Sequence, residues 1–196
     1  MTRGSTLPAH RLPHLTGRLP IPAQTRTPPA TLVDTFNTVP AEEALASLLA
    51  CLNSLCWARR VADHRPYPTV DALLAACDEA AYDLTAADLT EALAAETSPV
   101  LPEDAYEAAH TALSAAHAAY EARFGHAFVI CLDGTPRNEA LDRVLEGIRS
   151  RLTNDPEDER VLAADELRRL ARGRLMSRLR GAGNCATSPD GTTPGT

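Results

Sequence analysis

One stretch of the sequence, FGHAFVICLDG at residues 124–134, differs in composition from the alanine- and leucine-rich segments on either side of it. β-branched and aromatic residues gather there between two glycines, as they do in β-strands. No second or third strand-like run accompanies residues 127–132. Because a lone strand cannot form a stable sheet, the sequence predicts an all-α fold. We expect a single-domain helical bundle in which residues 126–132 form one short extended connector.

Capping residues and prolines divide the rest of the chain into helices. Threonine at an N-cap, proline in the first turn and acids at the positive end of the helix dipole are the usual signals for a helix start. The last helix is expected to run from about Asp155 to about Arg180. The other predicted helices begin near Pro40, Thr69, Thr85, Pro102 and Pro136.

The two ends of the chain have a different composition. Residues 1–33 contain six prolines, four arginines and no acid, and residues 181–196 are rich in Gly, Thr, Ser and Pro. Such segments bury too little apolar surface to order themselves. We therefore expect a disordered Pro/Arg-rich leader at 1–33, one helical domain at 34–180 and a disordered tail at 181–196.

Charge, hydropathy and cysteine usage exclude several classes of protein. The net charge of −7 opposes general attraction to nucleic acid or to an anionic membrane. The longest uncharged run, 44–58, is too short and too polar to span a bilayer. Five scattered cysteines, never spaced as CxxC, favour reduced thiols and a cytoplasmic location over disulfides or zinc. The arginine-rich segment 168–180 is an exception, because it is locally basic in a chain that is acidic as a whole.

Helical geometry singles out one arginine and argues against a metal site. At 100° per residue, Arg151 projects beside Val144, on the flank of the apolar stripe of its helix, where it could reach a partly buried anion or lie along the edge of the core. At that margin, its loss should cost less than about 1 kcal/mol. His110 and His117 lie about 10.5 Å apart along their helix, too far apart to share one metal ion.

With the helices placed, the chain resembles the 2-oxo-4-hydroxy-4-carboxy-5-ureidoimidazoline (OHCU) decarboxylases. The resemblance covers about 35–178. It is carried by Tyr120 to Ile130, by a helix that ends in Arg151-Leu152-Thr153-Asn154-Asp155, and by Glu159 and Glu166-Leu167 on the helix that follows. In the N-terminal half it is carried by Phe36-Asn37, Ser54-x-x-Trp57, Arg65-Pro66-Tyr67 and Leu73-Leu74.

This resemblance implies an all-α bundle, often a homodimer, that acts in the conversion of urate to allantoin without a metal or an organic cofactor. It implies that the backbone N–H groups of Phe128, Val129 and Ile130 face the oxygens of a ureide ligand. It also implies that Arg151 meets an anionic or carbonyl oxygen of that ligand through its planar guanidinium. An extended backbone suits this role, because N–H groups inside a helix are already bonded.

Two hallmarks of the family are missing. The family's acid/base is the histidine of an HPxIG motif, and here the matching stretch reads Ala95-Glu96-Thr97-Ser98-Pro99-Val100, with Glu96 at the histidine position. The SxxEQ motif is absent, since the only glutamine is Gln24. The interval from Glu96 to Tyr120 is also about 20 residues shorter than the family pattern allows. In addition, His126 stands where a second phenylalanine is common, and His117 where an asparagine is usual.

Three functions follow as hypotheses. The first is a family member with weak or lost decarboxylase activity that retains a pocket for a small anionic or ureide ligand. The second is an active, cofactor-free decarboxylase in which burial raises the pKa of Glu96 toward neutrality, so that Glu96 serves as the substitute acid/base. The third is a structural or dimerisation module without a ligand.

Overall fold

The computed structural model describes residues 32–99 and 107–185, with side chains through Gly181. Every regular element in these residues is an α-helix, which confirms the predicted all-α fold. The helices are α1 (Leu32–Thr38), α2 (Ala41–Leu49), α3 (Leu55–Asp63), α4 (Val70–Tyr82), α5 (Ala86–Ala94), α6 (Glu107–Phe124), α7 (Arg137–Arg151) and α8 (Pro156–Cys185).

The predicted start signals operate as expected. The Thr69 side chain accepts a hydrogen bond from the N–H of Ala72 and caps α4. Thr85 and Asp88 form a reciprocal capping box at the start of α5. Pro136 stands at the N-cap position of α7. Each device satisfies or removes backbone donors that a helix start would otherwise leave unpaired.

Both ends of the helical region extend beyond the boundaries predicted from composition. α1 begins at Leu32 and buries Val33, so the last two residues of the expected leader are helical. α8 continues to Cys185, five residues into the expected tail. Composition missed α1 because its apolar face, Val33 and Phe36, is short and directly follows a proline-rich segment. Residues 1–31 and 186–196 lie outside the described residues, as does the predicted helix start at Pro102.

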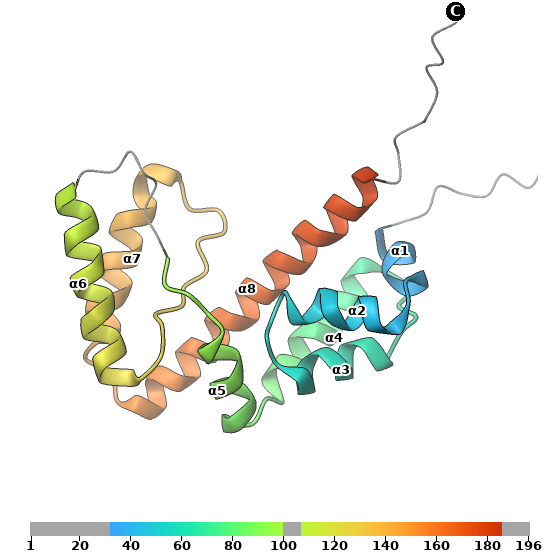
Figure 1. Cartoon of the computed structure of the whole chain (residues 1–196), viewed down its shortest axis with the longest axis horizontal. Helices are drawn as coiled ribbons and strands as arrows, with labels where there is room; N and C mark the ends of the chain where they lie inside the picture. The colour runs from blue at the N-terminus through green and yellow to red at the C-terminus, as the bar shows by residue number, and fades with distance from the viewer. Residues whose placement is uncertain (1–31, 100–106, 186–196) are drawn as a thin grey trace, which may run out of the picture.

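α8 is the axis of the fold (Figure 1). α1 to α4 lie on one side of it, and α6 and α7 form a separate helical pair on the other. The buried apolar side chains accordingly form two groups. The larger core joins α1 to α5 with α8, and the smaller cluster consists of Leu113, Tyr120, Phe128, Val144 and Ile148.

The 126–132 connector runs between these two groups and contains neither helix nor strand. Phe128 packs into the smaller cluster and Val129 into the larger core, because consecutive side chains of an extended backbone point to opposite sides. Gly125 and Gly134 bracket the connector with φ values of +78° and +79°. Glycine reaches this left-handed region without the steric penalty of a Cβ atom, so both ends of the connector can turn sharply.

The residue pairs of the N-terminal half that carry the family resemblance hold the larger core together. The Asn37 amide bonds both the N–H and the C=O of Tyr67, each at 2.8 Å. Arg65 donates to the carbonyls of Phe36 and Val39 at 2.9 Å. Trp57 is buried, and its Nε1–H donates to the Cys77 carbonyl at 2.9 Å. These contacts satisfy polar groups that are buried by the packing of α1, α3 and α4.

Two global expectations concern thiols and membranes. The four cysteines whose side chains the structure describes, Cys51, Cys56, Cys77 and Cys131, are free thiols. Burial raises the pKa of Cys51 and raises that of Cys77 to about 12, so both remain protonated at neutral pH.

None of the described helices has the length and apolar character that a membrane span requires.

Candidate functional site

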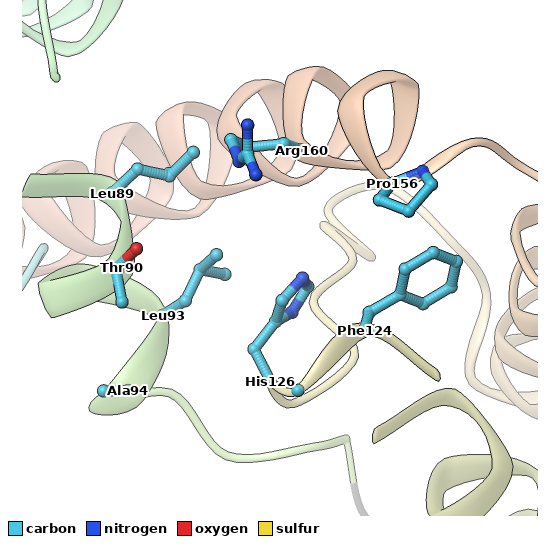
Figure 2. A pocket seen from close by; sticks show the side chains of 9 residues that line it. Leu89, Thr90, Leu93, Ala94, Phe124, His126, Pro156 and Arg160 are labelled. Carbon is cyan, nitrogen blue, oxygen red and sulfur yellow. The ribbon is translucent and has the colours of Figure 1, made fainter. Parts of the chain in front are cut away.

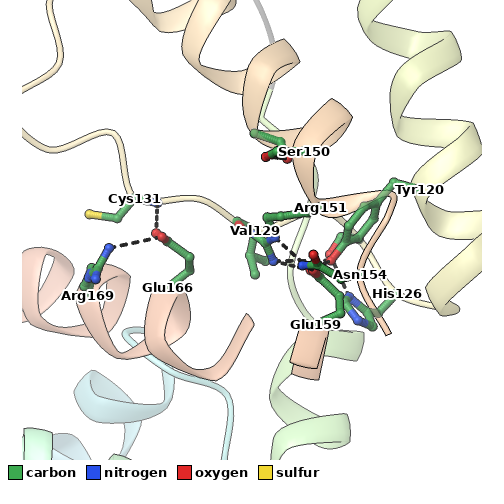
Figure 3. Close-up of polar contacts among 12 residues, drawn as sticks. Tyr120, His126, Val129, Cys131, Ser150, Arg151, Asn154, Glu159, Glu166 and Arg169 are labelled. Carbon is green, nitrogen blue, oxygen red and sulfur yellow. Dashed lines mark hydrogen bonds and ion pairs between the residues drawn. The ribbon is translucent and has the colours of Figure 1, made fainter. Parts of the chain in front are cut away.

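Arg151, the arginine singled out in the sequence, ends α7 and is buried, with 8% of its surface exposed. Its guanidinium points to the connector, where Nη1 donates to the Val129 carbonyl at 2.8 Å. Nε donates to Glu159 at 2.8 Å and Nη2 to the Tyr120 hydroxyl at 3.3 Å (Figure 3). The guanidinium also lies over the Phe128 ring, 4.7 Å from its centre. All three nitrogens of Arg151 are therefore bonded within the protein.

Glu159 on α8 is the fully buried partner of Arg151. Its carboxylate also accepts from the Tyr120 hydroxyl and, at 2.9 Å, from the Asn154 amide. Burial and this hydrogen bond to Glu159 raise the pKa of Tyr120 far above its ordinary value, so the phenol stays protonated. We call these four residues the Arg151 network. In the sequence, Tyr120 stood out only as part of the family resemblance, and nothing indicated that its hydroxyl would meet Glu159.

Burial of Arg151 changes the expected effect of its removal. An arginine on the margin of the core should cost less than about 1 kcal/mol to replace. Arg151 instead neutralises a carboxylate that has no access to solvent. Loss of one partner of such a pair typically costs about 3–5 kcal/mol. The periodicity of α7 located the residue correctly, but it could not show the partner, which belongs to another helix.

The backbone of the connector has hydrogen-bond donors that are not paired with any of the described residues. The Cys131 N–H donates to the Glu166 carboxylate at 2.7 Å (Figure 3). No acceptor in residues 32–99 and 107–185 takes a hydrogen bond from the N–H groups of Phe128, Val129 or Ile130. Phe128 and Val129 are nonetheless buried. Buried backbone donors are normally paired with protein, water or ligand, so these N–H groups are open to a further partner.

Glu96, which the sequence predicts to stand in place of the family histidine, lies just beyond the end of α5. Its two oxygens accept from Arg174 Nη1 and Nη2 on α8, at 2.6 and 2.7 Å. Arg174 also donates to the Cys51 carbonyl at 3.0 Å. The Glu96 side chain is only 8% exposed. The bidentate pair with Glu96 raises the pKa of Arg174 and ties the end of α5 to α8.

A concave site lies where α5, the start of the connector and the first turns of α8 meet (Figure 2). It holds about 200 Å³, and we call it the His126 hollow. A shallower space of about 380 Å³ adjoins it and is lined by Glu96 and Glu121. The two spaces share Leu93, Ala94, Gly125 and His126. The remaining residues of the His126 hollow are Leu89, Thr90, Phe124, Pro156 and Arg160.

His126 and Arg160 supply the polar chemistry of this hollow. The imidazole of His126 projects into the hollow from the connector, and Arg160 lies on the α8 wall (Figure 2). Nδ1 of His126 lies 3.0 Å from the Ala127 carbonyl. When Nδ1 carries the proton and donates to that carbonyl, Nε2 is an acceptor or a base. Arg160 pairs with Glu157 at the surface and is about half exposed. In the sequence, His126 stood out only as a departure from the family pattern.

The structure brings the predicted site residues together only in part. Arg151 meets the connector at Val129, while Glu96 lies at the edge of the space that begins at His126. His117 stacks against Phe128 with ring centres 6.4 Å apart. The described residues contain no group of three or more His, Cys, Asp or Glu side chains placed to hold a metal ion.

Comparison with known proteins points to one family. Two solved structures share the fold, both with a TM-score of 0.59. An OHCU decarboxylase crystallised in the presence of (S)-allantoin is 19% identical, and the match covers 72% of this chain and 99% of that one. An (S)-allantoin synthase is 20% identical over 76% of this chain, which spans only 54% of the synthase. A search of curated proteins found no match.

The family pattern itself matches in two pieces. The sequence pattern of OHCU decarboxylases covers residues 37–99 and residues 95–176 of this chain. The two pieces overlap at residues 95–99, the stretch that contains Glu96. Together they span well over half of the 196 residues. The chain belongs to the OHCU decarboxylase family.

Proposed function

We propose that this chain is an OHCU decarboxylase-family protein with weak or no decarboxylase activity that binds a small anionic or ureide ligand in the His126 hollow. The observation that supports the proposal is that some polar side chains are paired within the protein, whereas others face a cavity. Arg151 and Glu96 are occupied by partners within the protein. His126 and Arg160 face a cavity.

The first part of the proposal, weak or absent catalysis, rests on Glu96 and Arg151. To act as a base, Glu96 would have to leave a bidentate ion pair in which both of its oxygens accept hydrogen bonds. To bind a substrate anion, Arg151 would have to leave a fully buried carboxylate. A positioned acid or base contributes about 10²–10⁴-fold to a rate. Absence of the family histidine, with no free carboxylate in its place, removes most of that contribution.

The second part, ligand binding, rests on the His126 hollow. Its walls are apolar at Leu89, Leu93 and Phe124, and its polar groups are few, as is typical of small-molecule sites. Arg160 can exchange its solvent-exposed pair with Glu157 for a ligand anion at little cost, because exposed ion pairs contribute only about 0–1 kcal/mol. His126 Nε2 can accept a hydrogen bond from a ureide N–H.

Two measurements test the proposal. In the first, decay of freshly generated OHCU is followed by circular dichroism with and without the protein. We expect a rate close to the uncatalysed one. A rate near that of an authentic decarboxylase, abolished in Glu96→Gln, would show instead that Glu96 serves as the substitute acid/base.

The second measurement is the shift in thermal unfolding with millimolar allantoin. A ligand at 100 times its Kd stabilises the folded state by about 2.7 kcal/mol. We expect His126→Phe and Arg160→Gln to remove this stabilisation. Arg149→Gln is the matched control, because Arg149 is exposed on α7. If allantoin stabilises neither the parent protein nor the control, the third hypothesis, a structural or dimerisation module, replaces ours.

The assembly and the location of the protein also remain predictions. The resemblance to the family leads us to propose a homodimer, which light scattering coupled to size-exclusion chromatography would measure. The unpaired cysteines are consistent with the cytoplasmic location expected from the sequence.

A further inference from the structure

A second hollow lies along the C-terminal half of α8, and it shares no lining residue with the His126 hollow. It is an open groove of about 930 Å³ between α8 and the turn at Asp133-Gly134. We call it the arginine groove, because α8 contributes five arginines to its lining. Asp133 is the sole acid among its described lining residues, and the arginines are Arg169, Arg172, Arg174, Arg178 and Arg180.

The charges of the arginine groove are unevenly compensated along α8. Towards the middle of the helix, Arg169 pairs with Asp165 and Glu166, Arg172 with Asp78, and Arg174 with Glu96. From Arg172 to Cys185 the helix contains no acidic residue. Arg178 and Arg180 are exposed and form no ion pair with the described residues. The uncompensated positive charge therefore gathers at the C-terminal end of the groove.

The shape of the groove brings several guanidinium groups to one space. Arg174 and Arg178 are one helical turn apart, a rise of about 6 Å, so their side chains neighbour each other. At Gly173 the turn approaches the helix so closely that a Cβ atom would lie 2.4 Å from Asp133 Oδ2. The absence of a side chain at Gly173 lets the turn form the opposite wall. Arg174 is already paired with Glu96, whereas Arg178 beside it forms no ion pair with the described residues, so an anion in the groove would supply the counter-charge that Arg178 lacks.

We propose that the arginine groove binds a compact anion with two or more linked phosphate groups, of the pyrophosphate class. Guanidinium groups bond phosphate oxygens through paired N–H donors, and several guanidinium groups together favour a multiply charged anion. Arg169 and Arg180 are separated by about 16.5 Å along the helix, which limits the length of ligand that can be held. The net charge of −7 on the whole chain disfavours a long polyanion such as nucleic acid.

The test is a calorimetric titration of the full chain with sodium pyrophosphate, compared with orthophosphate and sulfate at matched ionic strength. We expect pyrophosphate to bind more tightly than either single anion. Arg178→Gln and Arg180→Gln should each weaken pyrophosphate binding roughly tenfold, as expected for loss of a charge-assisted hydrogen bond. Arg143→Gln on α7 is the control, since Arg143 is exposed and remote in sequence from α8. It should leave the affinity unchanged.

Three results would overturn the proposal. They are the absence of pyrophosphate binding, equal affinity for sulfate and pyrophosphate, and an equal loss of affinity in Arg143→Gln. A parallel titration with a single-stranded oligonucleotide gives a fourth such result. Tighter binding of the oligonucleotide than of pyrophosphate would assign the groove to nucleic acid. All three variants replace exposed side chains, so their thermal midpoints should match that of the parent. The outcome does not depend on the His126 hollow or on decarboxylase activity.

Discussion

The larger core and the smaller cluster are stabilised in different ways. In the larger core, six helices bury a continuous set of apolar side chains, and the polar contacts around it are caps, bonds to backbone carbonyls and partly exposed ion pairs of Asp78 and Glu96 with arginines of α8. In the smaller cluster, only five buried residues pack between α6, α7 and the connector. The Arg151 network lies against this cluster and links it to α8. A small apolar cluster contributes less burial energy, so its attachment depends more on polar contacts.

The connector is the element through which the two regions meet. Phe128 belongs to the smaller cluster, Val129 to the larger core, and the Val129 carbonyl accepts from Arg151. The same backbone continues to Cys131, whose N–H donates to Glu166 on α8. An extended segment can serve both regions because it presents alternate side chains to opposite sides while its polar groups remain free to bond side chains.

The largest expected effect comes from disruption of the Arg151 network. Arg151→Ala leaves Glu159 as a buried carboxylate without its cation, and should lower the free energy of unfolding by about 3–5 kcal/mol. Urea unfolding monitored by circular dichroism measures the change. The matched control is Arg143→Ala on the same helix, whose ion pair with Glu146 is long, at 3.9 Å, and exposed. It should change stability by less than about 0.5 kcal/mol. Equal effects of the two substitutions would show that the network adds nothing to the attachment of α6 and α7.

A comparable but more variable loss is expected from the larger core. Leu48 is fully buried on α2, and Leu48→Ala should cost about 2–5 kcal/mol through lost apolar burial and the cavity left behind. The two variants should also differ in which helices lose protection from amide hydrogen exchange. Amide hydrogen exchange should accelerate in α1 to α4 and α8 for Leu48→Ala, and first in α6 and α7 for Arg151→Ala. Identical exchange patterns in both variants would mean that the two regions unfold as one unit.

The smallest expected effect is a pH dependence confined to the smaller cluster. Burial lowers the pKa of His117 below its ordinary 6.5, and the nearby Glu121 carboxylate opposes the shift only in part. His117 Nε2 has no hydrogen-bond partner among the described residues. As pH falls below 6.5, the unfolded chain takes up this proton before the folded chain does, so stability is lost.

His117→Gln should remove that component of acid sensitivity. The measurement is the free energy of unfolding at about pH 7.5 and about pH 5.5 for the parent protein and the variant. We expect the parent to lose slightly more stability between the two values than the variant loses. A larger loss in the variant would place the sensitive group elsewhere.

Much of the architecture could be predicted from the sequence, because its signals are local. A threonine cap at Thr69, a capping box at Thr85 and a proline at Pro136 act within a single helical turn, and each starts the expected helix. The extended connector could also be predicted, since β-branched residues between two glycines disfavour a helix whatever surrounds them. Periodicity likewise placed Arg151 beside Val144, on the flank of the apolar stripe of α7.

The partners of these side chains were decided only by the tertiary structure. Arg151 meets Tyr120, 31 residues earlier in the chain, and Glu96 meets Arg174, 78 residues later. No local pattern encodes such pairs, because they depend on the angles at which α5, α6 and α7 pack against α8. The sequence by itself indicated most of the helical segments, though not α1 or the last turns of α8, and it indicated the one extended segment and the residues that carry charge. Only the packing of the helices decided which charges on distant segments neutralise each other, because burial of a charge is tolerated only where the fold supplies its partner. The same packing placed His126, Arg160 and the arginines at the end of α8 beside cavities.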